Sequence, residues 1–213
     1  MAYRRTENVV RKLAEREQTI LDAAQSIAGE EGMGGVQIAA VAHRADIAAG
    51  TVYRYFPSKN DLVAEMIAGT AERELAAMRA AADAAPGPLS ALAACIATFA
   101  ARALQERRFA WAVMAEPVDA DINTLRLKFR RELAAELEKR IGTAVTGGHL
   151  PDQDARFTAP AIIGAVLEGL VGPLAPSGST TREAVQTVTL LALRAIGVVD
   201  ARARGLVAQC VLP

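Results

Sequence analysis

The sequence predicts an all-α protein with a small N-terminal unit of three helices and a larger helical C-terminal part. Apolar residues recur three and four positions apart in one segment after another, which is the spacing of an amphipathic helix. Two capping boxes, Ser58 with Asp61 and Thr180 with Glu183, mark helix starts. The chain has 213 residues, of which 52% are hydrophobic, so it can bury a substantial core and is long enough for two small domains.

The first helix is expected from Glu17 to Glu31, where apolar residues recur at helical spacing and glycines follow, and Leu13 extends this pattern backwards. Two short helices with a tight turn between them come next. Ile38 and Val41 lie on one face of the first, and Asp46 then breaks the pattern with a side chain that tolerates a left-handed turn. The second ends at Phe56, because a residue that precedes proline is pushed out of the helical region.

The second short helix keeps a polar face exposed once Val52 and Phe56 are buried. Two helices joined by a short turn, the second presenting small groups, hydroxyls and cations, fit the major groove of DNA. Hydroxyls, Arg and Lys can all bond phosphates, and Arg can also read guanine. On spacing alone, the alternative is an ordinary helical corner with a polar surface. The candidate DNA-contacting residues are Gln37, Ala49, Gly50, Thr51, Tyr53, Arg54, Tyr55 and Lys59.

The run GTVYRYFPSKNDL, preceded by IAAVAHRADI and by an amphipathic helix, resembles the N-terminal DNA-binding domain of the TetR (tetracycline-repressor-like) transcriptional regulators. The resemblance in motif detail covers Gln18 to Met66, and only length and helical character match beyond it. It implies a helix-turn-helix domain in an all-helical homodimer. Such a dimer binds a palindromic operator as a repressor and is released when a small-molecule effector enters the C-terminal domain.

The chain departs from the family pattern at three places. Family members often have Ser or Thr at the start of the second helix, where this chain has Val36 and Gln37, and usually Gly at the turn, where it has Asp46. They tend to have Ser and then a polar or basic residue where Ala48 and Ala49 stand here. Ala caps a helix poorly, and Ala49 can offer a base only a methyl group, so base reading from that position is placed in doubt.

A long helix from Ser58 to Ala84 is expected to link the two parts of the chain, ending at the APGP break. At 1.5 Å per residue it spans roughly 35 to 40 Å, so a few degrees of tilt at one end moves the other by ångströms. We therefore expect residues 1–60 to form the N-terminal arm and DNA-binding domain, and residues 61–213 the effector-binding and dimerisation domain. The further helices expected are Leu89–Gln105, Phe109–Ala115, Ile122–Val145, Ala155–Leu174 and one from Thr180 through Ile196.

A short segment rich in large side chains, Phe109 to Met114, has two readings. It fills the core, or it forms the wall of a ligand cavity, which the family resemblance places in this region. Arg126 follows the apolar Leu125 and is a candidate to meet an acidic ligand, although a charge run is usually a solvated face. The candidate effector-pocket residues are Met66, Phe99, Trp111, Met114, Arg126 and Phe129.

The last two strongly apolar helices predict a surface that a second subunit covers, as the family resemblance also implies. The alternative is burial inside one chain. The tail after Val199 has no clear period and yields no prediction. The candidate dimer-interface residues are Ile162, Val166, Leu170, Val185, Val188 and Leu193.

The 24 basic and 24 acidic residues cancel, so affinity for DNA must come from a local patch. The N-terminal arm, Met1 to Arg16, has five basic residues against two acidic ones. It is either a solvated, disordered terminus or an arm that touches the minor groove or the DNA backbone. The five basic residues are Arg4, Arg5, Arg11, Lys12 and Arg16.

The sequence lacks the constellations of an enzyme. His43 and His149 are the only histidines, and no metal-ligand spacing, GxSxG motif or glycine-rich phosphate loop is present, so we expect no metal and no cofactor. Cys95 and Cys210 lie far apart, no signal peptide is readable and no membrane span is expected, all of which favour the cytoplasm. Two other functions compete with a regulator: a helical binding protein or enzyme for a lipid-like or aromatic compound, and a DNA-architectural dimer without an effector.

Overall fold

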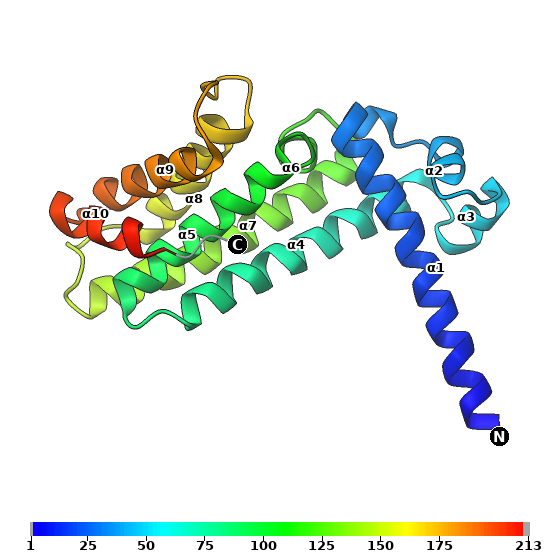
Figure 1. Ribbon diagram of the computed structural model, residues 1–213, viewed down its shortest axis with the longest axis horizontal. Coiled ribbons are helices and arrows are strands. Elements are labelled where there is room, and N and C mark those ends of the chain that lie inside the picture. Colours follow the sequence, from blue (N-terminus) through cyan, green and yellow to red (C-terminus); the bar gives the residue numbers. More distant parts are fainter. Residues whose placement is uncertain (1, 211–213) are drawn as a thin grey trace.

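The computed structural model describes the backbone of residues 2–210 and the side chains of residues 8–210. Within residues 2–210 the secondary structure is helical and no strand occurs, so the all-α prediction is confirmed. Figure 1 shows an elongated molecule with α1, α2 and α3 at one end and α8, α9 and α10 at the other. The long helices α4, α5 and α7 run between the two ends, and the N-terminal half of α1 projects away from the body.

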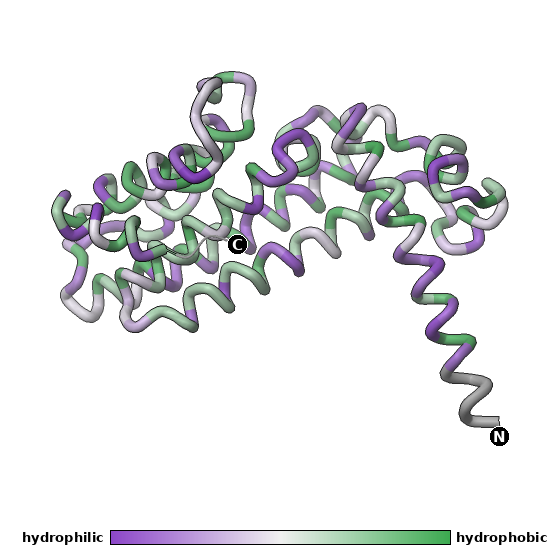
Figure 2. The backbone as a smooth tube through the Cα atoms, in the orientation of Figure 1, coloured by the Kyte–Doolittle hydropathy of each residue, from purple (hydrophilic) through white to green (hydrophobic). Residues whose placement is uncertain are grey.

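The N-terminal end is built from α1 (Ala2–Glu31), the short 3-10 helix η1 (Met33–Gly35), α2 (Ile38–Arg44) and α3 (Ala49–Tyr55). The predicted first helix was too short, because the structure extends it from Glu17 back to Ala2. No Pro or Gly interrupts the chain before Glu17, and its Arg, Glu, Lys and Leu residues favour helix without forming an apolar face. Hydrophilic residues predominate along this projecting half of α1 (Figure 2).

Local chemistry sets the boundaries of α2, α3 and α4 as the sequence predicts. Asp46 adopts a left-handed conformation with φ of 51° at the turn between α2 and α3. Phe56, before the proline, is extended and ends α3. Ser58 caps α4, because its Oγ accepts a 3.1 Å hydrogen bond from the backbone N–H of Asp61.

The C-terminal part packs around α5, whose side chains are mostly buried. By length and composition α5 could cross a membrane, but 67% of it is buried in the molecule, as in the core helix of a water-soluble protein. The apolar run from Ala155 forms α8 and then a five-residue π-helix, η2. A last helix, α10, forms in the tail after Val199, for which no structure was predicted. The elements are α4 (Lys59–Asp83), α5 (Pro88–Gln105), α6 (Arg107–Met114), α7 (Ala120–Thr146), α8 (Ala155–Val166), η2 (Leu167–Val171), α9 (Thr181–Ala195) and α10 (Asp200–Gln209).

A buried carboxylate joins α4 to α7. Glu136, on α7, is 5% exposed and accepts hydrogen bonds of 2.9 Å from Arg79 of α4 and from Arg140 of its own helix. Arg140 also donates to Asp83 at 2.8 Å. Burial raises the pKa of Glu136, but the hydrogen bonds from the two guanidinium groups outweigh it, so the pKa lies below its usual value.

Candidate nucleic-acid interface and ligand cavity

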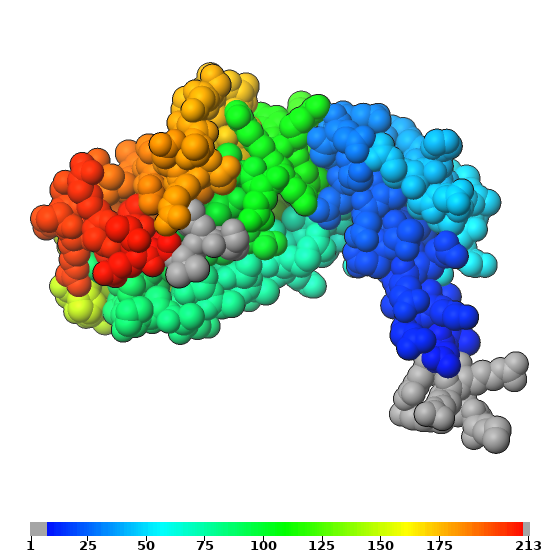
Figure 3. Space-filling view, in the orientation of Figure 1, coloured from blue at the N-terminus to red at the C-terminus, as the bar shows by residue number. Residues whose placement is uncertain are grey.

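Helices α2 and α3 form the outer surface at the N-terminal end of the molecule (Figure 3), and Tyr53 and Arg54 of α3 are exposed there. Val52 is fully buried and Phe56 nearly so, and these two side chains hold the helix against the domain core. The guanidinium carbon of Arg54 lies 5.7 Å from the centre of the Tyr55 ring, close enough for a cation–π contact. Gly50 has no neighbouring atom within 4 Å of the position that a Cβ would take, so this point of α3 is open.

The structure places all eight predicted DNA-contacting residues in or beside the helix-turn-helix, with none fully buried. Tyr53 is 53% exposed. Gln37 precedes α2 and donates a 2.9 Å hydrogen bond to the carbonyl of Gly34. Gln37, Ala49, Gly50, Tyr53 and Arg54 are exposed, whereas Thr51, Tyr55 and Lys59 are half-buried.

Helix α2 is fixed to α1 by an ion pair. Both terminal nitrogens of Arg44 donate to the Glu30 carboxylate at 2.8 Å, and Nη1 also donates to Ser26 Oγ at 2.6 Å. The hydrogen bond from Arg44 is the main cause that lowers the pKa of Glu30 to about 2. Arg44 is therefore engaged with α1 in a surface ion pair, and Arg54 carries the positive charge on the exposed face of α3.

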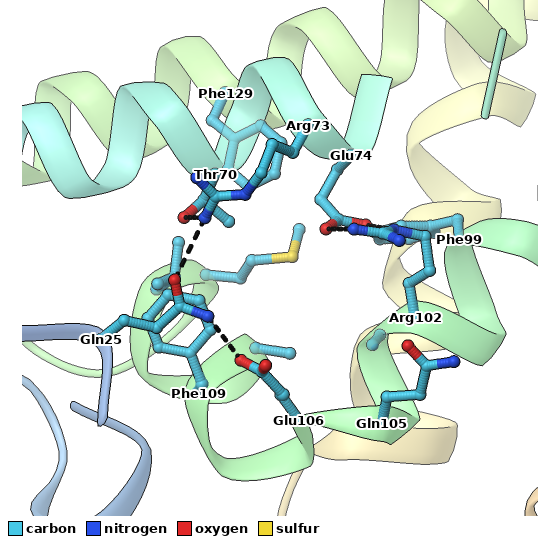
Figure 4. A pocket seen from close by; sticks show the side chains of 14 residues that line it. Gln25, Thr70, Arg73, Glu74, Phe99, Arg102, Gln105, Glu106, Phe109 and Phe129 are labelled. Atoms are coloured by element: carbon cyan, nitrogen blue, oxygen red, sulfur yellow. Dashed lines mark hydrogen bonds and ion pairs between the residues drawn. The ribbon is translucent and has the colours of Figure 1, made fainter. Parts of the chain in front are cut away.

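A cavity of about 160 Å³ lies among α1, α4, α5, α6 and α7. Its wall is apolar and contains three phenylalanine rings, and its rim is polar (Figure 4). On the rim, Arg102 makes a two-pronged ion pair with Glu74, at 2.7 Å and 2.8 Å. The apolar lining includes Phe99, Phe109, Val113, Met114 and Phe129, and the polar lining consists of Gln25, Thr70, Arg73, Glu74, Arg102, Gln105 and Glu106.

Three of the predicted pocket residues, Phe99, Met114 and Phe129, line this cavity, and three do not. Met66 is buried in α4, outside the lining. Trp111 packs beside Gly172, where a Cβ would lie 3.0 Å from the indole ring. A Cβ would also lie 2.8 Å from a Glu168 carboxylate oxygen and 3.0 Å from the Leu167 carbonyl oxygen, so glycine at position 172 avoids all three contacts.

Arg126 was predicted as a contact for an acidic ligand, and the structure gives it another role. Its side chain is buried, and it donates to the carbonyl of Val113 at 2.8 Å, to that of Ala112 at 3.0 Å and to that of Glu116. These carbonyls lie at the C-terminal end of α6, where a helix leaves acceptors without internal partners. Arg126 therefore caps α6, and its own side chain is not part of the cavity lining.

The polar rim was missed by sequence reasoning, although one signal was available. Arg102 is the only charged residue in the 18-residue α5, and a single charge in a helix otherwise fit for the core requires a partner. That partner, Glu74, is 28 positions away, so only the fold brings the two together. Gln25 comes from α1, and its place at the cavity likewise depends on tertiary packing.

The cavity helix α6 is also tied to the N-terminal end of the molecule through the residues that follow it. Just after α6, the Glu116 carboxylate accepts a 2.8 Å hydrogen bond from the backbone N–H of Met33, in the turn that follows α1. Gly32 adopts φ of 80° there, and a Cβ at this position would lie 2.6 Å from a Glu116 oxygen. Glycine at position 32 thus permits both the left-handed turn and the approach of Glu116.

The six residues predicted for the dimer interface are all buried within a single chain, with exposures between 0% and 7%. They form part of the protomer core, so a second subunit would meet other side chains. On the same part of the molecule Phe157 is 77% exposed and Leu191 is 54% exposed. These six dimer-interface candidates are Ile162, Val166, Leu170, Val185, Val188 and Leu193.

Residues 20–66 match the family model described as bacterial regulatory proteins, tetR family. Over 59 residues the chain is 51% identical to the HTH-type transcriptional repressor KstR of Rhodococcus jostii (strain RHA1), and over 49 residues it is 57% identical to KstR of Mycobacterium tuberculosis (strain ATCC 25618 / H37Rv). The first match covers 28% of this chain and 28% of the relative, and the second covers 23% and 22%. The chain thus matches about a quarter of the length of these curated relatives.

Solved structures resemble the chain over most of its length. One is RolR in complex with its ligand resorcinol, with a TM-score of 0.67, 19% identity, and coverage of 96% of this chain and 98% of that chain. Another is the fatty acid degradation regulator FadR from Bacillus halodurans, with a TM-score of 0.75, 18% identity, and coverage of 86% and 97%. At these identities the likeness concerns the fold.

Proposed function

We propose that this chain, which carries the DNA-binding domain of the TetR family in residues 20–66, is a transcriptional repressor that a small-molecule effector releases from a palindromic operator. The observation that carries the proposal is the outward polar face of α3, anchored by buried Val52 and Phe56 in a segment half identical to known repressors. We assign DNA binding to residues 1–60, and effector binding and dimerisation to residues 61–213. The proposed site of action is the cytoplasm, and the function involves no catalysis, metal or cofactor.

In this proposal the groups on α3 divide between the DNA backbone and the bases. Tyr53, Tyr55 and Lys59 bond phosphates and fix the orientation of the helix. Thr51 and Arg54 lie nearest to the base edges, and Arg54 can pair with guanine. Two subunits place their α3 helices roughly 34 to 36 Å apart, in successive major grooves.

In this proposal the effector binds in the cavity that α1, α4, α5, α6 and α7 line, and it changes the position of the DNA-binding end, which is formed by α1, α2 and α3. Two connections support this coupling: α4 runs from Ser58 to the cavity, and Glu116 ties the end of α6 to Met33. The effector can shift the dimer only by its difference in affinity for the DNA-binding and released states.

Gel-shift titration with the DNA that flanks the gene tests the proposal. Specific binding should weaken steeply as salt rises, because phosphate contacts release counterions. Absence of any specific complex would contradict the regulator function and favour a helical binding protein. A specific complex that no small molecule weakens would favour the DNA-architectural alternative.

We further propose that homodimerisation uses the exposed apolar side chains near α8 and α9, including Phe157 and Leu191, since the buried candidates are enclosed in the core. Replacing Leu191 with Asp should shift the sedimentation coefficient from dimer to monomer, because a carboxylate cannot be buried unpaired. Leu127→Asp, on α7 and 40% exposed, is the matched control and should remain dimeric. A dimer that survives both Leu191→Asp and Phe157→Asp would place the interface elsewhere.

A further inference from the structure

Gln25 connects the DNA-binding end to two helices of the C-terminal part across the mouth of the cavity. Its Nε2 donates a 2.8 Å hydrogen bond to Glu106, which stands between α5 and α6. Its Oε1 accepts a 3.1 Å hydrogen bond from Arg73 of α4. Figure 4 shows the three side chains in a row at one side of the cavity, with the Phe109 ring close to Gln25. The side-chain amide of one α1 residue therefore acts as both donor and acceptor on the cavity rim.

The charges on the rim favour a neutral ligand. The four ionisable side chains are two guanidinium groups, Arg73 and Arg102, and two carboxylates, Glu74 and Glu106. Arg102 and Glu74 already satisfy one another through two hydrogen bonds. Arg73 and Glu106 instead share Gln25 as their partner. A carboxylate ligand that paired with Arg73 would bring a second negative charge beside Glu106, and an ammonium ligand that paired with Glu106 would bring a second positive charge beside Arg73, so a neutral ligand is favoured.

The size and wall of the cavity favour a single ring. A volume of about 160 Å³ is close to the roughly 150 Å³ that accommodates benzene in an engineered apolar cavity. Phe99, Phe109 and Phe129 provide faces and edges against which an aromatic ring packs favourably. A long acyl chain or a fused polycyclic compound exceeds this volume.

The functional group on the ring follows from the bonds that Gln25 makes. A group that takes the place of the Gln25 amide must donate to Glu106 and accept from Arg73. A neutral hydroxyl or carboxamide can do both, whereas a carboxylate can only accept and an ammonium group can only donate. A bare hydrocarbon ring can do neither.

We propose that the effector is a neutral, single-ring compound with a hydroxyl or carboxamide group, and that it acts by displacing Gln25 from Arg73 and Glu106. The displacement releases α1 from α4 and α6, and with it the support of the helix-turn-helix. Space for the displaced side chain exists, because Gln25 and Glu106 also line an open groove on the side of Asp22 and Ser26. This proposal rests on the function proposed above and adds the ligand class and the residue that couples ligand to DNA.

Calorimetric titration of the full chain with four probes tests the ligand class. Phenol and benzamide should bind about two- to tenfold more tightly than toluene and benzoate, since a net hydrogen bond contributes about 0.5 to 1.5 kcal/mol. Toluene or benzoate binding as tightly as phenol and benzamide, or no binding by any of the four, would overturn the ligand class.

Variants of Gln25 test the displacement. In Gln25→Ala the competing amide is gone, so phenol and benzamide should bind several-fold more tightly than to the wild type. Gln18→Ala is the matched control, because Gln18 also lies on α1 and donates to Asp22 at 2.7 Å, away from the cavity lining. Gln25→Met keeps the size of the side chain without its hydrogen bonds and should behave as Gln25→Ala does. Unchanged probe affinity in both Gln25 variants would contradict the displacement.

Hydrogen exchange and DNA binding then separate this proposal from the proposed function. Saturating phenol should accelerate amide exchange in residues 20–31 of the wild type and of Gln18→Ala, whereas both Gln25 variants should exchange fast without phenol. Phenol should lower the affinity of the wild type for a specific operator by about 5- to 150-fold. The operator affinity of Gln25→Ala should stay nearly unchanged when phenol is added. Phenol-dependent exchange without any specific DNA complex would remove the repressor function and leave the coupling through Gln25 intact. A specific DNA complex without phenol-dependent exchange would leave the repressor function intact and overturn the coupling through Gln25.

Discussion

The carboxylate of Glu116 accepts a 2.8 Å hydrogen bond from the backbone N–H of Met33, which joins the end of α6 to the turn between α1 and α2. Because this N–H is partly buried, loss of its acceptor leaves an unsatisfied donor. Glu116→Ala should lower the free energy of unfolding by about 1 to 2 kcal/mol, measured by urea denaturation. Glu116→Gln retains an acceptor and should lose less. Equal stability of all three proteins would contradict this contact.

Gly32 and Gly34 form a matched pair in the same turn. Gly32 has φ of 80° and faces Glu116 at close range, whereas Gly34 has no atom within 4 Å of a built Cβ. Gly32→Ala should lower the free energy of unfolding by about 1 to 3 kcal/mol through backbone strain and displacement of Glu116. Gly34→Ala should stay within about 0.5 kcal/mol of the wild type. Thermal denaturation of both variants distinguishes the two positions.

The buried guanidinium of Arg126 is predicted to support stability independently of any ligand. Arg126→Met removes the cap from the carbonyls at the end of α6 and should lower the free energy of unfolding by about 2 to 4 kcal/mol. Arg131→Met, at an exposed position of the same helix, provides the comparison and should change it by less than about 0.5 kcal/mol. If Arg126→Met were as stable as Arg131→Met, the capping role would be wrong.

Acid should weaken the contact between α4 and α7. The pKa of Glu136 in the folded protein lies below its unfolded value of about 4.3, so the ionised form stabilises the fold above that pH. This contribution disappears as the pH falls through the lower, folded-state pKa. We expect the free energy of unfolding of the wild type to fall on acidification below about pH 4, and that of Glu136→Gln to fall less steeply. Parallel pH profiles for the two proteins would argue against Glu136 as a source of the effect.

Arg54 is predicted to contact a base, so the loss of affinity caused by its replacement should depend on the DNA sequence. Arg54→Ala should weaken binding to a specific operator by about 1 to 3 kcal/mol and relax the preference at one base position. Tyr53→Phe removes the hydroxyl that we propose to bond a phosphate, and it should weaken binding to specific and unrelated DNA alike. Fluorescence anisotropy on both kinds of DNA provides the comparison. Equal losses for Arg54→Ala on every sequence would make Arg54 a phosphate contact.

The helix-turn-helix was predictable because its signals act over short distances. Asp46 sets its turn, the proline after Phe56 ends α3, and Ser58 caps α4 through Asp61, all within a few residues. The start of α1 was not predicted, because the first half of this helix has intrinsic helix propensity but no buried apolar face, and so it lacks the apolar periodicity that marks a helix in a sequence.

The residues of the cavity and of the dimer interface could not be predicted, because they depend on tertiary packing that a single sequence does not reveal. Periodicity identifies an apolar face without telling whether the partner of that face is the same chain or a second one. Val166 and Leu193 were predicted to face a second subunit, but they are buried in the core of one chain. Phe157, which follows polar residues at the start of α8, is instead exposed. The cavity rim arises from pairs such as Gln25 and Glu106, 81 positions apart, for which no local pattern exists.

The cap on α6 restricts how that helix can move. Arg126 holds its C-terminal carbonyls and Glu116 ties the next residues to Met33, while Phe109, near its other end, faces the cavity. If a ligand pushes on Phe109 while the C-terminal end of α6 stays fixed, α6 should rotate about that end and should not shift along its axis. Ligands of different shape would then produce different angles of rotation about the same fixed point, and the degree of derepression would be graded by the bulk of the ligand beside Phe109.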